Sequence, residues 1–269
     1  MPAAPVLARA ALHLWEEPCV SGVRGSGTIF FSGCILGCCF CQNYTISHGR
    51  EGKAVTPERL ADIFRELEAA GAHNINLVNP THYADAILAA AELYRPKVPV
   101  VYNSGGYERV ETLRRLEGLV DVYLPDLKFV DRERAGRYAG APDYFASASA
   151  ALMEMYRQTG KAVYEEEDGA RLMRRGMLVR HLLMPQGTAD AIRALTWIKE
   201  NLPGVPVSLM AQYVPCGEAA RCKEITRRVT QREYDKVLAA LEELGLDGYV
   251  QQLESGVKTF IPPFDGAGV

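Results

Sequence analysis

Six short apolar runs, separated by segments with helical patterns, constrain the fold of this 269-residue chain more than any other feature. Each run is nearly continuous in apolar residues rather than alternating, as expected for parallel strands that are covered on both faces. The alternation of runs and helical segments predicts a parallel α/β architecture. The runs are Thr28–Phe31, Ile75–Val78, Val98–Tyr102, Val120–Leu124, Met177–Leu183 and Val205–Ala211.

Helix boundaries are marked between the runs. Thr56, followed by a proline, is typical of an N-cap, and Gly71 of a helix end. Thr188 is expected to cap a second helix. Thr230–Glu233 has the pattern of a capping box, with Gly245 as the stop of that third helix.

The chain length limits the number of strand–helix units. A complete eight-stranded barrel usually needs about 250 residues by itself, so six units with an open side fit this chain better. We therefore predict a partial (β/α)6 TIM-like barrel over 27–212, with a 1–26 extension and a 213–269 extension packed on it. The longest stretch between runs, 127–176, is expected to carry two helices and an acidic turn at Glu165–Asp168.

Composition narrows the class of protein. Apolar residues make up 48% of the chain, which is ample for a buried core, and the net charge of −3 gives no sign of a nucleic-acid or membrane surface. We find no run of 18 apolar residues and no N-terminal signal segment, so we expect a cytoplasmic protein. A reducing compartment also suits exposed thiolates.

Three of the seven cysteines stand in a Cys-x3-Cys-x2-Cys pattern at Cys34, Cys38 and Cys41. A four-iron four-sulfur cluster normally takes four cysteines. Three thiolates on one short loop would hold three corners of such a cluster and leave one iron open. An open metal position is where a substrate or cofactor binds.

Other uses of these cysteines are open to test. A fourth ligand from Cys39, Cys19 or Cys216 would make the chain a non-catalytic iron–sulfur electron carrier. A structural zinc protein would need four ligands, usually in two separated pairs, and Cys216 and Cys222 are too far apart for a zinc knuckle. Disulfides do not suit four cysteines within eight residues of a cytoplasmic chain.

Polar residues follow the predicted strands at their C-terminal ends, where active sites form in βα barrels. The first strand runs directly into the cysteine loop. The polar residues at the ends of the other five strands are Asn79, Thr81, Asn103, Ser104, Asp126, Lys128, Arg180 and Gln212.

The cysteine motif, with Phe40 before its last cysteine, resembles the signature of radical S-adenosylmethionine (radical SAM) enzymes. The stretch Cys34–Ser47 resembles, in particular, the activating enzymes of pyruvate formate-lyase and an uncharacterised branch related to them. Asp126-Leu127-Lys128 and the stretch Val179–Pro185 continue the resemblance, which covers roughly residues 27–212.

The resemblance implies a set of ligands and contacts. Cys34, Cys38 and Cys41 would ligate one 4Fe-4S cluster per chain, and its open iron would bind SAM, with Phe40 near the adenine. The ribose, carboxylate or substrate backbone would be held by Asn103, Ser104, Asp126, Lys128 and Arg180.

One position departs from the activases, which carry a Gly-Gly-Glu motif after the second strand. The chain has Val78-Asn79-Pro80-Thr81 there, so SAM would be held by the Asn79 carbonyl or the Thr81 hydroxyl. Gln212, at the end of the sixth strand, is a further expected contact.

The resemblance also implies the reaction. A flavodoxin or ferredoxin would supply the electron that reduces the cluster. The reduced cluster would then cleave SAM to methionine and a 5′-deoxyadenosyl radical that abstracts hydrogen from a substrate. Because a six-stranded barrel leaves a lateral gap, we expect a peptide or protein substrate, as for an activase.

Alanine substitution separates the cluster ligands from the other cysteines. We expect the Cys34→Ala, Cys38→Ala and Cys41→Ala proteins each to lose the cluster after anaerobic reconstitution, because each removes one of three thiolates. Iron content and visible absorbance measure the loss. Cys39→Ala, Cys19→Ala, Cys216→Ala and Cys222→Ala are matched controls that should retain the cluster, and loss of the cluster in Cys39→Ala or Cys216→Ala would contradict the three-ligand assignment.

Overall fold

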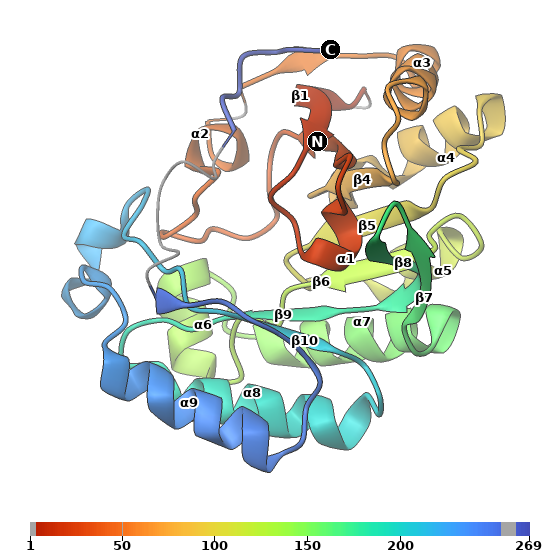
Figure 1. Cartoon of the computed structure of the whole chain (residues 1–269). Helices are drawn as coiled ribbons and strands as arrows, with labels where there is room; N and C mark the ends of the chain where they lie inside the picture. The colour runs from red at the N-terminus through yellow and green to blue at the C-terminus, as the bar shows by residue number, and fades with distance from the viewer. Residues whose placement is uncertain (1–3, 50, 254–261) are drawn as a thin grey trace.

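The computed structural model describes residues 4–49, 51–253 and 262–269. Strands and helices alternate along most of the chain (Figure 1). The strands are β1 Val6–His13, β2 Ser26–Phe31, β3 Lys53–Ala54, β4 Ile75–Val78, β5 Val100–Ser104, β6 Val122–Pro125, β7 Val163–Glu167, β8 Ala170–Met177, β9 Val179–Leu182, β10 Val207–Met210 and β11 Gly248–Val250. The helices are α1 Pro18–Ser21, α2 Tyr44–Ser47, α3 Pro57–Ala69, α4 Ala84–Leu93, α5 Val110–Arg115, α6 Arg132–Ala139, α7 Tyr144–Thr159, α8 Thr188–Asn201 and α9 Gln231–Glu243, with short 3₁₀ turns η1 Thr81–Tyr83, η2 Ala219–Arg221 and η3 Lys223–Ile225.

The parallel strands form a curved sheet in sequence order. β2, β4, β5 and β6 pair in parallel, and β9, β10 and β11 form a second parallel set. The two sets are joined at β6, whose start pairs with β8 while Asp126, just past its end, bridges to Arg180 in β9. Because β8 leads directly into β9, the chain crosses from one set to the other without leaving the sheet.

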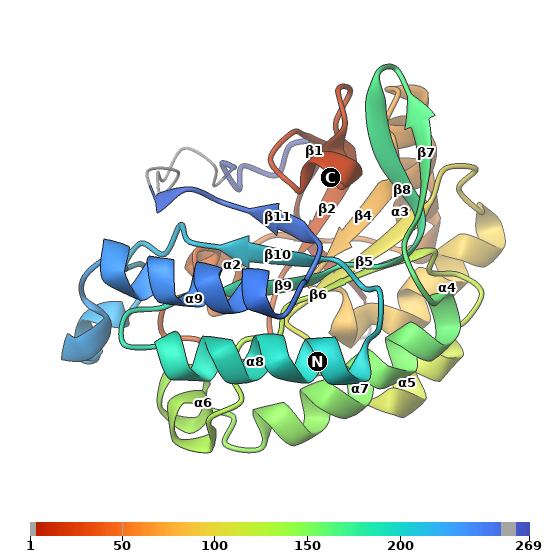
Figure 2. The same ribbon diagram turned by 60° about the horizontal axis from the view of Figure 1, so that its bottom comes forward.

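The helices lie on the outer side of this sheet (Figures 1 and 2). α3 shows why: Leu60, Ile63, Phe64 and Leu67 recur at helical spacing and are all buried, while the other face is polar. The N-cap Thr56 accepts a hydrogen bond from the backbone N–H of Arg59, as its sequence predicts.

The six predicted strands are all present, and the predicted parallel α/β class with a partial barrel is confirmed. The capping box at Thr230 is also confirmed. Two local predictions were wrong. Gly187, not Thr188, occupies the N-cap of α8. Glu165–Glu167 lie in strand β7, and only Asp168 lies in the turn, because β7 and β8 form a hairpin there.

The termini add strands that the apolar runs do not reveal. β1 pairs antiparallel with β2 and also pairs with β3. The C-terminal residues 262–269 lie against β1, where Ala10 N donates to Ala267 O and Gly266 N donates to Ala8 O. β11, in the predicted C-terminal extension, extends the sheet beyond β10. The boundaries at 26 and 213 remain predictions.

Candidate active site

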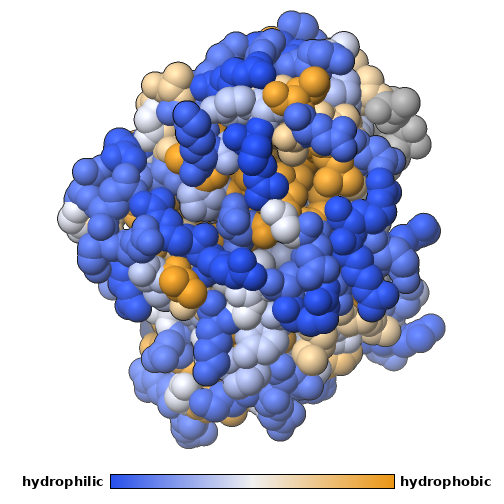
Figure 3. Space-filling view, turned by 90° about the vertical axis from the view of Figure 1, so that its right-hand side faces the viewer, coloured by the Kyte–Doolittle hydropathy of each residue, from blue (hydrophilic) through white to orange (hydrophobic). Residues whose placement is uncertain are grey.

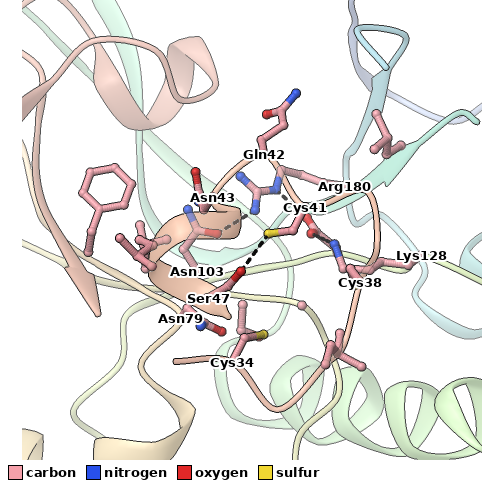
Figure 4. Close-up of a pocket in the computed structure, with 18 of the residues that line it drawn as sticks. Cys34, Cys38, Cys41, Gln42, Asn43, Ser47, Asn79, Asn103, Lys128 and Arg180 are labelled. Carbon is pink, nitrogen blue, oxygen red and sulfur yellow. Dashed lines mark hydrogen bonds and ion pairs between the residues drawn. The ribbon is translucent and has the colours of Figure 1, made fainter. Parts of the chain in front are cut away.

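A pocket of about 270 Å³ lies at the C-terminal ends of the parallel strands. Cys34, Cys38 and Cys41 all line it, and Figure 4 shows these cysteines around the same space as Lys128 and Arg180. Eight of the nine predicted cofactor-binding residues also line the pocket. These eight are Phe40, Asn79, Asn103, Ser104, Asp126, Lys128, Arg180 and Gln212.

The cysteine loop is held by backbone hydrogen bonds to the C-terminal turn of α6. Gly37 N donates to Ala139 O, and Cys39 N donates to Tyr138 O, both at 2.9 Å. Phe40 is buried and makes edge-on or tilted ring contacts with Phe129 and Tyr213. The loop is therefore anchored through its backbone and one aromatic, which leaves the thiols to face the pocket.

The three thiols are soft donors; Cys38 is buried, and Cys34 and Cys41 are partly buried. Burial raises the pKa of Cys38 and of Cys34, and the neighbouring Cys41 sulfur raises each of these pKa values further. Ser47 Oγ donates to Cys41 Sγ at 3.3 Å (Figure 4). Thiols of this kind become thiolates when they coordinate a metal, so the donor set fits an iron–sulfur cluster, whose ligands are thiolates.

A buried charge network lines the same pocket. Arg180 Nε donates to Asp126 Oδ1 at 2.9 Å, and Lys128 Nζ donates to the other oxygen of the same carboxylate. Burial alone would raise the pKa of Asp126, but the charges of Arg180 and Lys128 hold it below its ordinary value. Burial alone would lower the pKa of Lys128, but the Asp126 charge and hydrogen bond, together with the nearby Cys38 sulfur, raise it. All three groups are thus charged at neutral pH.

Glu16 completes this network and was missed in the sequence. Its carboxylate accepts hydrogen bonds from Asn76 Nδ2 at 3.0 Å, Asn103 Nδ2 at 3.2 Å and Arg180 Nη1 at 3.2 Å. Burial raises the pKa of Glu16, and Arg180 opposes the rise. The available signal was a pair of glutamates directly before Pro18 in an otherwise apolar and aromatic stretch.

Asn79 and Thr81 occupy different positions after β4. Asn79 lines the pocket in the left-handed conformation, with φ of 60°, and its Nδ2 donates to Gly33 O just before the cysteine loop. Thr81 does not line the pocket. Its Oγ1 donates to Glu108 Oε1 at 2.7 Å. The structure therefore brings Asn79, but not Thr81, to the cysteines.

The described residues contain no three His, Cys, Asp or Glu side chains grouped to hold a single metal ion. A four-iron cluster is wider than one ion, so its ligands stand farther apart than those of a zinc site. No fourth described cysteine lines the pocket. Cys39 hydrogen-bonds with Cys222, and Cys19 with Tyr249.

No helix among the described residues is long and apolar enough to span a membrane. The face in Figure 3 is mostly hydrophilic, with hydrophobic residues showing in small groups.

Comparisons with known proteins agree with the geometry. The Radical SAM superfamily matches residues 28–164. The uncharacterised protein MJ0674 of Methanocaldococcus jannaschii is 32% identical over 246 residues, which cover 88% of this chain and 67% of that protein.

Two solved structures are similar to this chain, the first in its overall fold and the second only in part. A radical SAM methyltransferase from Sphaerobacter thermophilus is similar with a TM-score of 0.56 at 15% identity, covering 86% of this chain and 68% of that one. A domain of pyruvate-formate lyase-activating enzyme from Bacteroides vulgatus has a TM-score of 0.41 at 15% identity, covering 73% of this chain and 91% of that one. At that TM-score the likeness says nothing about function, so the activase branch remains a prediction.

The buried Glu108, beside the site, gives a pH prediction. Burial raises its pKa from an ordinary value of 4.5 to about 7, although hydrogen bonds from Thr81, Ser104 and Tyr102 oppose the rise. Between pH 4.5 and about pH 7, Glu108 is therefore protonated in the folded protein but has lost its proton in the unfolded chain. Stability should therefore fall as pH rises from 4.5 to about 7 and change little from this group above that.

Urea unfolding of wild type and Glu108→Gln at pH 5 and pH 8 measures this effect. Gln cannot ionise, so the variant should gain on wild type at pH 8 relative to pH 5, by on the order of 3 kcal/mol at most. Glu111→Gln, at an exposed site on α5, is the control and should show no such gain. Equal pH dependence of Glu108→Gln and wild type would contradict the raised pKa.

Proposed function

Because the chain belongs to the Radical SAM superfamily, we propose that this radical SAM enzyme binds a 4Fe-4S cluster through Cys34, Cys38 and Cys41 and cleaves SAM reductively in the pocket beside them. Family membership implies both the cluster and SAM. The observation that carries the proposal is the single pocket shared by three thiols and a buried charge network, with no fourth described cysteine lining it. A closed electron-carrier cluster would need that fourth ligand.

The protein's own residues would bind and orient the cofactor. SAM carries an amino group, a carboxylate and a ribose. Lys128 and Arg180 are cations suited to a carboxylate, and the Asp126 carboxylate and the Glu16 carboxyl group supply oxygens suited to an ammonium or to ribose hydroxyls. Asn103 bridges Arg180 and Glu16, since its Oδ1 accepts from Arg180 and its Nδ2 donates to Glu16. Ser104 and Gln212 add polar groups at neighbouring strand ends.

The same network would limit reorganisation during the reaction. Three thiolates at the loop are a concentration of negative charge, and Lys128 lies close enough to lower the pKa of Cys38 after burial has raised it. Because each cation is already paired with a carboxylate, the charges are fixed before any ligand arrives. When bound, the reduced cluster would supply one electron to SAM, which gives methionine and the 5′-deoxyadenosyl radical that abstracts hydrogen from a substrate.

For the substrate we propose a peptide or protein, as for an activase. The cavity of about 270 Å³ is near the lower limit of about 300 Å³ for small-molecule sites, so it offers little room for a second ligand beside SAM. A substrate side chain or backbone reaching in from outside would need less of that room. The 213–269 extension, which we expect to pack on the barrel, includes residues 254–261, which lie outside the described residues.

We further propose that the enzyme works in the reducing cytoplasm and takes its electron from a flavodoxin or ferredoxin. Free thiols at all seven cysteines are consistent with that compartment.

Anaerobic reconstitution tests the proposed function. SAM should change the electron paramagnetic resonance spectrum of the reduced protein, because it binds the open iron, and dithionite should then release 5′-deoxyadenosine slowly without substrate. Asp126→Asn should weaken SAM binding, since it removes the charge that pairs Lys128 and Arg180. Cys222→Ala, outside the pocket, is the control and should behave as wild type.

An unchanged spectrum with no 5′-deoxyadenosine would favour a non-catalytic electron carrier. Stoichiometric zinc in place of iron, with no visible absorbance, would favour the structural zinc protein instead.

A further inference from the structure

The segment 216–228 covers the outer side of the cysteine loop. Glu218 N donates to Cys39 O at 2.7 Å, and the Cys39 and Cys222 thiols share a hydrogen bond. None of the described residues 216–228 lines the pocket. Figure 1 shows this segment on the left, beyond α2 and α6, with η2 and η3 within it. The loop that carries the three ligands therefore lies between the pocket and this surface segment.

The outer segment is basic, although the chain as a whole has a net charge of −3. Residues 221–228 read Arg-Cys-Lys-Glu-Ile-Thr-Arg-Arg, with four basic residues and one acidic residue. Arg137, at the end of α6, lies beside them and pairs with Glu224 at 2.8 Å. We call the exposed side chains of Arg137, Arg221, Lys223, Arg227 and Arg228 the basic patch.

The ion pairs within the patch present their cations to solvent. The Arg137 side chain is 60% exposed and its partner Glu224 only 19%. Arg221 is 73% exposed against 34% for Glu218. In the third pair, the Arg227 side chain is 42% exposed and that of Glu233 is 15% exposed. A molecule that approaches this face therefore meets positive charge first, even where each arginine has a carboxylate partner.

We propose that the basic patch docks an acidic one-electron carrier protein, such as a flavodoxin. The proposal rests on the proposed function, since the cluster held by the loop must receive an electron from outside. The pocket side of the loop faces SAM and substrate, so the outer side is the remaining approach. Cys39 follows the ligand Cys38 in the chain, and its thiol hydrogen-bonds with Cys222, which stands between Arg221 and Lys223 of the patch.

The chemistry of the step is simple. The carrier's flavin hydroquinone loses one electron and becomes a semiquinone, while the cluster gains that electron, and no covalent bond forms or breaks. Opposite surface charges raise the encounter rate and make it depend on salt.

Charge reversal on the patch tests the proposal. The Arg221→Glu/Lys223→Glu variant should associate with flavodoxin hydroquinone more slowly at low salt, on the order of tenfold, and its rate should lose most of its salt dependence. Stopped-flow flavin absorbance with the reconstituted full chain measures both. The matched control Arg65→Glu/Lys97→Glu changes the same charge at exposed sites on α3 and before β5, and should keep the wild-type rate.

Two further measurements separate docking from folding and from the cluster itself. Visible absorbance and reduction by a small photochemical reductant should be equal in all three proteins. If the reversal variant does not fold, Arg221→Gln/Lys223→Gln replaces it, with a smaller decrease expected. Failure of every protein, wild type included, to form a cluster would contradict the proposed function, and calorimetric binding of flavodoxin to the wild-type and patch-variant chains would then test the docking surface by itself.

Three results would overturn the proposal. The reversal variant would react with flavodoxin as fast as wild type, or the control pair would slow as much as the patch pair. Alternatively, single-stranded RNA would bind wild type more tightly than flavodoxin does and lose that binding in the patch variant, which would make the patch a nucleic-acid surface.

Discussion

The arrangement of the site depends on one buried guanidinium. Arg180 lies in β9, and its three nitrogen atoms each reach a different element: Asp126 after β6, Glu16 before α1 and Asn103 in β5. Bringing a charge into a protein interior is costly unless every donor is satisfied. The hydrogen bonds of the Arg180 guanidinium therefore fix the position of the N-terminal segment at Glu16. They also fix how the two sets of parallel strands meet at β6. The pocket is a consequence of that junction.

The rest of the site follows from the sheet. Because the strands are parallel, their C-terminal ends meet at one edge, and the cysteine loop leaves β2 at the same edge. Backbone hydrogen bonds join the loop to the C-terminal turn of α6 and to Glu218 of the 216–228 segment. One side of it faces charged groups in the pocket, and the other faces solvent through the basic patch. A loop held between two such environments can separate the entry of an electron from the binding of a cofactor.

The sequence allowed much of this to be predicted, for identifiable reasons. Parallel strands buried on both faces leave continuous apolar runs, so β2, β4, β5, β6, β9 and β10 could be found. Glu16 could not, because no local pattern shows that a glutamate in a terminal segment will meet an arginine 164 residues away. The position of Thr81 away from the pocket could not be predicted, because a place after a strand end does not determine side-chain direction, and here its hydroxyl donates to Glu108. The β7–β8 hairpin was missed because its acidic residues look like a turn when read alone.

A double-mutant cycle on Glu16 and Arg180 tests the central claim most directly. Arg180→Met leaves the buried Glu16 without its cationic partner and leaves Asp126 with Lys128 alone, and we expect it to lower the free energy of unfolding by roughly 3–5 kcal/mol. Glu16→Gln keeps one oxygen to accept from Asn76 and Asn103 but loses the hydrogen bond from Arg180 Nη1, and it should cost less because Arg180 keeps Asp126. Because the loss in Arg180→Met includes the stranded Glu16 charge, the double variant should be more stable than the sum of the two single losses predicts. Additive losses in urea unfolding would show that Glu16 and Arg180 do not act together, and would contradict the account.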